Sequence, residues 1–276
     1  MIDLHCHSHF SDGGQSPEAL LKKALDANIA VLALTDHDTV NGLAALHQAA
    51  VGQNIRIING IELSVRWKKT DIHILGLNID PTNPAMAALI AMQNESRITR
   101  AKQIAEKMQL LGISRAYERA CEIAGHERVG RPHFAKVFME ENAALTMQNA
   151  FKRYLGRGKS AYAPTPWISI TEAVEGILEA KGQAVLAHPL KYSLTRTKLH
   201  ELIVAFKEAG GRGIEVVSGE VTVSQIQEMA GLSIRYALLA SSGSDYHDDG
   251  ISRILLGRQR QLPVNCTPVW EHWDSE

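Results

Sequence analysis

The chain has 276 residues, of which 45% are hydrophobic and 21% charged, and its formal net charge at pH 7 is -1. This composition is that of a globular protein and excludes a disordered chain. The nearly neutral charge argues against a protein that coats nucleic acid by bulk attraction. The sequence shows no signal peptide, and no apolar run approaches the ~18 residues of a membrane span. We therefore expect a cytoplasmic protein that does not contact membranes.

Seven short apolar runs predict buried strands, and helical patterns separate most of them. The predicted strands are residues 2–4, 30–35, 56–61, 72–79, 184–187, 213–217 and 237–241. The predicted helices of this part are residues 17–28, 40–51, 171–180, 198–209 and 223–230. Strands that alternate with helices predict an α/β barrel or a wound sheet. In such folds the chemistry gathers where strands end.

One connection breaks the parallel pattern. Residues 68–70 alone separate the strand that continues through residues 62–67 from the next strand. A loop this short suits an antiparallel hairpin and is too short for a crossover. We therefore expect His73 to lie beside residues 64–65 and close to Glu62.

Between the fourth and fifth strands the pattern becomes purely helical. We interpret residues 84–168 as an inserted helical subdomain that covers the substrate site, and residues 1–83 and 169–276 as the barrel. The proline-rich stretch at residues 161–166 is a plausible return linker, since its prolines cannot continue a helix. Residues 84–170 hold 13 Lys/Arg and 7 Asp/Glu, a balance of +6. A basic insert is thus set into an acidic body.

Polar residues follow the predicted strands in a repeated pattern. His5 and His7 end the first strand, and their i, i+2 spacing points both rings the same way in an extended chain. Asp245 and His247 repeat this spacing after the seventh strand. The other candidate ligands lie between these two motifs in the sequence. The nine candidate metal ligands are His5, His7, Asp12, His37, Glu62, His73, His188, Asp245 and His247.

Nine candidate ligands exceed what one ion uses. A transition metal takes about four to six, so the set implies two or three metals that share ligands. Mixed imidazole and carboxylate ligands favour manganese, zinc or iron over magnesium and calcium. Manganese is the first choice. Asp36 and Asp38, which flank His37, are expected to orient rings or metal-bound water.

The ordered motifs resemble a known family. They are His5-x-His7, Asp12, Thr35-Asp36-His37-Asp38, Gly60-Ile61-Glu62, His73-Ile74-Leu75-Gly76-Leu77, Ala187-His188-Pro189 and Gly243-Ser244-Asp245-x-His247. Together they resemble the polymerase and histidinol phosphatase (PHP) superfamily over almost the whole chain. This resemblance implies a distorted seven-stranded (β/α) barrel with a trinuclear metal site, expected to hold three Mn²⁺ ions, that hydrolyses phosphate esters.

The insert narrows the resemblance. Residues 94–101, 130–135, 151–155 and 158–162 resemble the subgroup that contains ribonuclease AM, a 5′-to-3′ exoribonuclease, and the 3′,5′-nucleoside bisphosphate phosphatases. Arg97 and Arg100 lie three apart on a predicted helix, so they share a face suited to a nucleotide phosphate. Arg131 and His133 lie near a predicted helix start, where backbone amides attract anions. With the family match, these four are the expected phosphate contacts.

These observations predict a mechanism of water attack. Clustered cations lower the pKa of a bridging water from ~15.7 toward neutrality, so the resulting hydroxide attacks phosphorus without a protein nucleophile. Asp245 is expected to be essential, and His188 or His247 to protonate the leaving group.

The leading reading is an exoribonuclease on short RNA or RNA 5′ ends that also hydrolyses 3′,5′-nucleoside bisphosphates. A dedicated bisphosphate phosphatase is the alternative. A phosphatase of an amino-acid precursor and a non-catalytic, metal-stabilised binding module are weaker readings.

Overall fold

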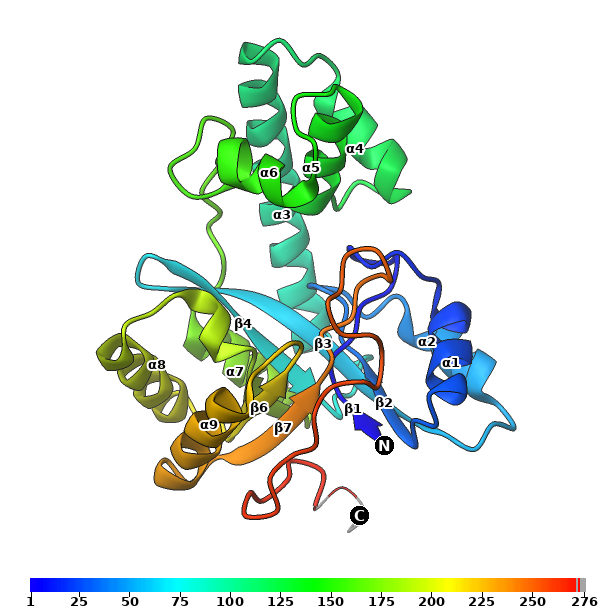
Figure 1. Cartoon of the computed structure of the whole chain (residues 1–276), viewed down its shortest axis with the longest axis vertical. Coiled ribbons are helices and arrows are strands. Elements are labelled where there is room, and N and C mark those ends of the chain that lie inside the picture. Colours follow the sequence, from blue (N-terminus) through cyan, green and yellow to red (C-terminus); the bar gives the residue numbers. More distant parts are fainter. Residues whose placement is uncertain (272, 274–276) are drawn as a thin grey trace. The chain divides into compact units, whose positions relative to one another are not determined.

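A computed structural model describes residues 1–271 and 273 of the chain. The chain divides into two compact units, which are coloured along the sequence in Figure 1. The first unit comprises Met1–Leu89 and Ile168–Glu276, and the second comprises Ile90–Trp167. None of the helices in the described residues combines the length and the apolar character that a membrane-spanning helix needs.

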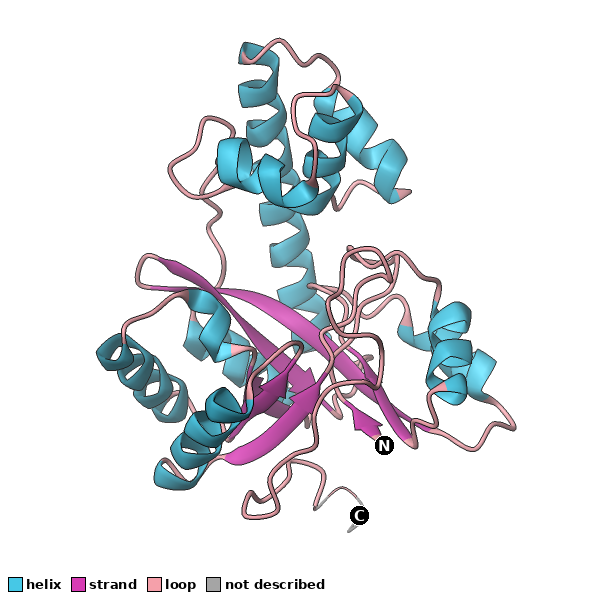
Figure 2. Cartoon of the chain, viewed as in Figure 1, coloured by secondary structure: helices cyan, strands magenta, loops and turns pink. Residues whose placement is uncertain are grey.

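The first unit is built on one seven-stranded sheet whose strands neighbour one another in chain order (Figure 2). The strands are β1 (Ile2–Asp3), β2 (Val31–Leu34), β3 (Arg56–Trp67), β4 (Thr70–Leu77), β5 (Gln183–Leu186), β6 (Gly213–Ser218) and β7 (Leu239–Gly243). All neighbouring pairs are parallel except β3–β4 and β4–β5, so β4 alone runs in the opposite direction.

The sheet nearly closes on itself where the chain leaves β1 and β7. The Leu4 amide donates to Ser242 O at 3.1 Å, and the His7 amide donates to Tyr246 O at 2.9 Å. In return, the amide of Asp245 donates to His5 O at 2.8 Å. The predicted distorted seven-stranded α/β barrel is therefore confirmed, and its seam joins the segments that carry His5-x-His7 and Asp245-x-His247.

The predicted hairpin is also confirmed. Strands β3 and β4 pair antiparallel from Gly60 opposite Leu77 to Trp67 opposite Thr70. In this register His73 lies opposite Ser64, two residues beyond Glu62. Side chains two apart on a strand share a face, so the hairpin places His73 and Glu62 on the same side of the sheet.

Helices cover the outer face of the sheet. They are α1 (Pro17–Asp26), α2 (Leu43–Ala50), α7 (Ile170–Glu179), α8 (Arg196–Glu208) and α9 (Val223–Arg235), with a 3₁₀ turn, η2 (Pro189–Tyr192), after β5. Several begin with a hydroxyl cap, as the sequence rules for helix starts require. At α7, Ser169 Oγ accepts from the Glu172 amide and the Glu172 carboxylate accepts from the Ser169 amide.

The predicted boundaries shift most around the seventh strand. The sequence places this strand at residues 237–241, whereas β7 begins at Leu239, and α9 continues to Arg235 beyond the predicted end at residue 230. The reason is local: Ala237 has φ = 48°, and its amide bonds back to Ile234 O. The apolar residues at 237 and 238 thus belong to the turn that ends the helix.

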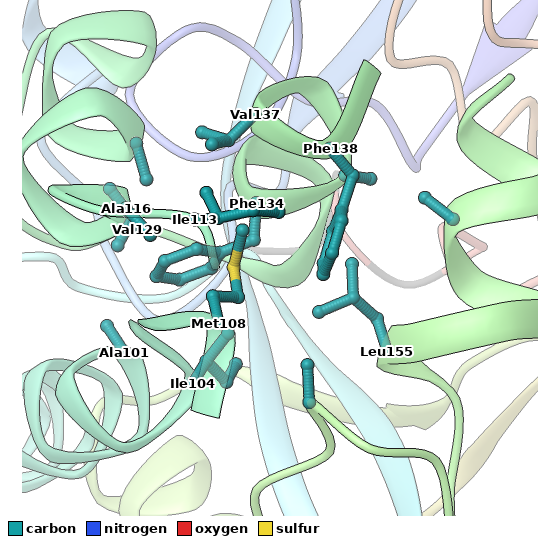
Figure 3. Close-up of a cluster of buried hydrophobic side chains, with 14 of the residues drawn as sticks. Ala101, Ile104, Met108, Ile113, Ala116, Val129, Phe134, Val137, Phe138 and Leu155 are labelled. Atoms are coloured by element: carbon teal, nitrogen blue, oxygen red, sulfur yellow. The ribbon is translucent and has the colours of Figure 1, made fainter. Parts of the chain in front are cut away.

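The second unit is helical, with its own apolar core (Figure 3). Its elements are the greater part of α3 (Pro84–Leu110), with α4 (Ala116–Ala124), α5 (Arg131–Glu140), α6 (Met147–Ala150) and a π-helical turn, η1 (Phe151–Leu155). Met108, Phe134 and Phe138 are each 0% exposed in this core. Residues 161–166, the predicted linker, contain no helix or strand.

The close approach at the barrel seam gives a testable prediction. A Cβ at Gly243 would lie 2.8 Å from His5 N and 2.3 Å from His5 Cβ, so Gly243→Ala forces the segment after β1 to move. We expect it to lower the unfolding free energy by roughly 1–3 kcal/mol, as overpacking does. At Gly231, inside α9, the added Cβ meets nothing within 4 Å.

Gly231→Ala is therefore the matched control, expected to be stabilising by roughly 0.5–1 kcal/mol because alanine is the better helix former. Urea unfolding of the two variants provides the measurement. Equal stability changes would contradict the packing described for the seam.

Candidate metal centre

Nine side chains of the first unit converge in one cluster, and all nine are those that the sequence singles out. Their ligand atoms form four overlapping groups in which the members lie within 4.8 Å of one another. The groups are His7/Asp12/His37/His247, His5/His7/Asp245, His5/Glu62/His188 and His37/Glu62/His73. Because His5, His7, His37 and Glu62 each belong to two groups, the geometry suits several cations that share ligands.

The alternation of side chains between the two faces of an extended segment directs His5 and His7 toward the site. Cys6, between His5 and His7, is 0% exposed and packs in the core with Tyr246, which holds the same position between Asp245 and His247. Side chains of an extended segment alternate between faces, so the core residues fix the two flanking pairs toward the site. His5 Nε2 and His7 Nε2 consequently lie 3.2 Å apart, and each lies 3.4 Å from Asp245 Oδ1.

Glu62 lies at the centre of the cluster and is 0% exposed. Its Oε1 is 2.9 Å from both His73 Nδ1 and His188 Nε2. Its Oε2 is 3.3 Å from His5 Nε2, 3.2 Å from His7 Nε2 and 3.1 Å from His37 Nδ1. One carboxylate therefore faces five imidazoles.

Asp12 lies on the loop that follows His7, next to His37 and His247. Its Oδ1 is 3.4 Å from His247 Nε2, and its Oδ2 is 3.8 Å from His37 Nε2. Asp36 holds this loop, because its carboxylate accepts from Ser8 N at 2.7 Å and from Ser11 Oγ at 2.7 Å. Asp36 was expected to orient a ring or a metal-bound water, but the hydrogen bonds of its carboxylate hold the backbone and hydroxyls of the segment before Asp12.

The donor atoms fit divalent cations. His37 Nδ1 and Glu62 Oε2 face each other at 3.1 Å, yet in the described residues neither has a partner in hydrogen-bond geometry. Buried polar atoms without partners are costly and rare in native proteins. Converging lone pairs from imidazole and carboxylate are what a transition metal requires, so these residues fit bound ions.

Electrostatics also favour positive charge here. Burial by itself would lower the pKa of His7, but the neighbouring carboxylates of Asp245 and Glu62 outweigh it and raise the pKa to about 10. Burial likewise works against the charge on Asp245, yet the neighbouring His5 and Lys191 hold its pKa well below its usual range. For His37 burial dominates and lowers the pKa to about 3. The carboxylates thus favour a positive charge on His7, whereas burial opposes one on His37.

Glu215 is a functional residue that the sequence reasoning missed. It lies in β6, is 1% exposed, and its Oε1 accepts from His5 Nδ1 at 2.9 Å while Oε2 accepts from the His188 amide at 2.6 Å. A proton fixed on His5 Nδ1 leaves Nε2 free to bind a cation, which is how carboxylates orient metal-binding histidines. The signal was present as the single acid in an apolar strand.

Two residues of η2 were also missed. Lys191 donates from Nζ to Asp245 Oδ2, the carboxylate oxygen that does not face His5 and His7. The Tyr192 hydroxyl donates to Ala187 O at 2.7 Å and accepts from the His73 amide at 2.8 Å, so it ties β4 to the end of β5. Nothing in the sequence distinguishes them from other residues of a surface turn.

Strained backbone accompanies the ligands. Asp38, His188 and Asp245 have φ values of 50°, 26° and 52°, a region that side chains with a Cβ rarely adopt. Such residues persist where the surrounding structure holds them, and they concentrate at functional sites. At Asp38 the support includes Oδ1, which accepts from the Ser64 amide at 2.7 Å.

The four expected phosphate contacts lie in the second unit. Arg97 and Arg100, on one face of α3, are 7% and 5% exposed, and their guanidinium carbons lie 5.2 and 4.8 Å from the Trp167 ring centroid. Arg131 is the first residue of α5. The nearby His133 is 5% exposed and its Nδ1 accepts from the Gly130 amide at 2.9 Å, so this amide is not available to an anion.

The role of Glu215 can be tested by substitution. Glu215→Gln removes the charge that orients His5 but keeps the shape, so we expect manganese affinity to fall by ~10–100-fold. The control is Glu220→Gln, because Glu220 follows the same strand but is exposed and pairs with Arg253. Calorimetric titration of each metal-free variant measures the affinities. Equal affinities in the two variants would remove the assigned role of Glu215.

Proton release on metal binding gives a second test. The pKa of His7 is raised above its unfolded value, so below about pH 10 the metal-free site holds a proton that a cation must displace. Metal affinity should therefore increase as pH rises toward 10. At pH 7, calorimetry in buffers of different ionisation enthalpy should register protons released. Affinity that stays constant from pH 6 to 9 would count against this account.

Comparisons with known proteins agree with this geometry. The model of the PHP domain family matches residues 3–219. Over 99% of its length the chain is 39% identical to a 3′,5′-nucleoside bisphosphate phosphatase from Chromobacterium violaceum, covering 96% of that protein. It is also 39% identical to the 5′-3′ exoribonuclease Rnm of Escherichia coli K12, across 100% of this chain and 94% of the relative.

The fold is shared with a solved structure. An amidohydrolase from Chromobacterium violaceum, with bound sulfate and no metal, superposes with a TM-score of 0.94 at 38% identity, covering 99% of this chain and 96% of that one. The similar chains span the whole molecule, including both units. The protein is accordingly a hydrolase that acts on phosphate esters, and it belongs to the PHP domain family.

Proposed function

We propose that the protein is a 5′-to-3′ exoribonuclease that acts on short RNA or RNA 5′ ends and also hydrolyses 3′,5′-nucleoside bisphosphates. The observation that carries the proposal is the convergence of nine imidazole and carboxylate ligands in one cluster. Similarity over the full chain to one relative of each activity supports the substrate class. Both reactions transfer phosphorus to water and differ in the size of the leaving group.

We propose three manganese ions as the cofactor, held by the nine clustered residues. Four overlapping ligand groups with shared members accommodate three ions, and imidazole-rich shells suit manganese, with zinc or iron(II) as alternatives. When bound, divalent cations supply an activated water and positive charge for phosphate oxygens. The role of Glu62 is to hold the cluster together, since it faces five of the six histidines.

We propose that a histidine at the rim moves the proton to the leaving oxygen. The side chain of His247 is 22% exposed and that of His188 is 7% exposed, so His247 is the better placed of the two to reach a substrate. Its Nδ1 lies 3.0 Å from Asp245 O and its Nε2 is directed at the cluster and at Asp12, so the proton would move on Nε2, which during that step would not bind a cation. Asp245, with His5 and His7, would hold cations beside the histidine that moves this proton.

The insert, residues 84–168, supplies the phosphate grip in this proposal. Arg97, Arg100, Arg131 and His133 are proposed to bind a phosphate group of the substrate. Stacking on Trp167 holds two of the guanidinium groups in place, which lowers the entropy lost when a phosphate binds. The net charge of +6 over residues 84–170 supports binding of an RNA chain.

A dedicated 3′,5′-nucleoside bisphosphate phosphatase is the second candidate, because one relative is such an enzyme. Comparison of kcat/KM on 5′-phosphorylated short RNA and on adenosine 3′,5′-bisphosphate separates the two. The exoribonuclease proposal expects efficient turnover of both. RNA left intact while the bisphosphate is hydrolysed would favour the phosphatase. Failure on both and on an aryl phosphate would favour a non-catalytic binding module.

Two substitutions test the assignment of roles. Asp245→Ala removes a ligand that faces His5 and His7, so both activities should fall by more than the ~100-fold caused by loss of a supporting residue. Arg131→Ala should raise KM by roughly tenfold and leave kcat nearly intact, since a charged hydrogen bond contributes ~1.5–3 kcal/mol.

Lys102→Ala, an exposed cation on α3, is the control and should change neither constant. Steady-state kinetics with manganese-loaded protein on both substrates gives the comparison. A larger loss of kcat in Arg131→Ala than in Asp245→Ala would overturn the assigned roles.

A further inference from the structure

A cavity of about 200 Å³ adjoins the metal centre in the first unit. It lies between η2, the end of β6 and the first turns of α9. Three of its lining residues, His188, Lys191 and Glu215, belong to the metal centre or contact it directly. Ligands of barrel enzymes bind at this end of the strands, so the position is that of a substrate subsite.

The walls of the cavity are partly apolar. Val216 and Met229 line it and are each 1% exposed, and Leu190 and Val221 contribute further apolar surface. A methionine thioether packs favourably against aromatic rings and adapts to their shape. These walls therefore suit a flat ring rather than a hydrated ion.

Two polar atoms of residues that line the cavity lack a hydrogen-bond partner in the described residues, namely Ser218 Oγ and His188 Nδ1. Ser218 is 5% exposed, and its Oγ makes no hydrogen bond in the described residues. A buried hydroxyl left unpaired costs roughly 1–3 kcal/mol, so a ligand that bonds to it gains affinity. Gln225 adds an amide to the same cavity. The site thus offers hydrogen bonds at defined points between apolar walls.

The volume of the cavity and the charges that line it limit which ligand class can bind. Pockets that enclose whole drug-sized ligands measure ~300–1,000 Å³, so this cavity suits one part of a ligand whose remainder lies outside. Glu215 and Glu220 line it as carboxylates, whereas the Lys191 ammonium is already bonded to Asp245. This balance disfavours a phosphate and favours an uncharged ring with polar edges.

We infer that the cavity binds the nucleobase of the nucleotide whose phosphate reaches the metal centre. The inference rests on the proposed function and deepens it, because it names the part of the substrate that the barrel itself recognises. A single buried hydroxyl and an amide read few edge positions, so the subsite accepts more than one base. The sugar and phosphate extend from the cavity past His188 and Lys191, the lining residues that belong to or contact the metal centre.

The test measures binding of a base rather than turnover of a nucleotide. Hydrolysis of an aryl phosphate by manganese-loaded protein is inhibited with adenosine 5′-monophosphate or with ribose 5-phosphate, which lacks the base. We expect the wild-type protein to bind the monophosphate at least ~10-fold more tightly, a difference of about 1.4 kcal/mol. Calorimetric titration with the same two ligands gives the comparison without turnover.

Filling the cavity should erase this preference. Val221 is half-buried in its wall, so Val221→Trp should weaken binding of the monophosphate by ~10-fold and leave ribose 5-phosphate unaffected. Val223→Trp is the matched control, because Val223 is 54% exposed on the same helix start and does not line the cavity. The control should keep the wild-type ratio.

A second pair of variants tests the hydroxyl. Ser218→Ala should weaken binding of adenosine 5′-monophosphate by ~2–10-fold, as expected for the loss of one hydrogen bond. Ser241→Ala should not weaken this binding, although Ser241 Oγ is also buried without a partner, because Ser241 lies in β7 and does not line the cavity.

Equal binding of the two ligands to the wild-type protein, or equal loss of both in Val221→Trp, would overturn the inference. If the protein hydrolyses neither RNA nor bisphosphates but still binds adenosine 5′-monophosphate more tightly than ribose 5-phosphate, only the proposed function is contradicted.

Discussion

The structure depends on one buried carboxylate. Glu62 is fully enclosed, and its two oxygens face five imidazoles at 2.9 to 3.3 Å. A buried anion surrounded by neutral rings is costly unless positive charge compensates it. Protons on His5 and His7 supply that charge in the metal-free protein, where the pKa of both is raised. Divalent cations supply it better, because they satisfy the ring nitrogens and the carboxylate together.

The fold brings these groups together by three devices. Reversal of β4 places His73 on the face that carries Glu62, the closed seam sets His5 against Asp245, and Glu215 fixes both His5 and His188 from β6. Each device uses backbone or buried side chains of the barrel rather than mobile loops. Rigid support of this kind reduces the reorganisation that ions and substrate would otherwise require.

Much of the metal centre could be predicted because seven of the nine candidate ligands follow strands. In an extended chain, the spacing His5-x-His7 predicts that both rings point to the same side. The short loop at residues 68–70 likewise predicts the hairpin. Glu215 could not be predicted, because its partners His5 and His188 are distant in the sequence and only the fold brings them together. Likewise, Arg97 and Arg100 share a helix face by spacing, but their packing on Trp167 joins positions distant in sequence. The nucleobase cavity is lined by η2, the end of β6 and the start of α9, which are separate in the sequence. No local sequence pattern therefore predicts it.

The central claim is that nine side chains enclose several divalent cations. Anomalous diffraction at the manganese absorption edge, from crystals of manganese-loaded protein, tests it most directly. The account predicts strong peaks inside the cluster, with Glu62 and Asp245 each adjacent to a peak. Diffraction that places manganese elsewhere on the molecule and leaves the cluster without a peak would contradict it.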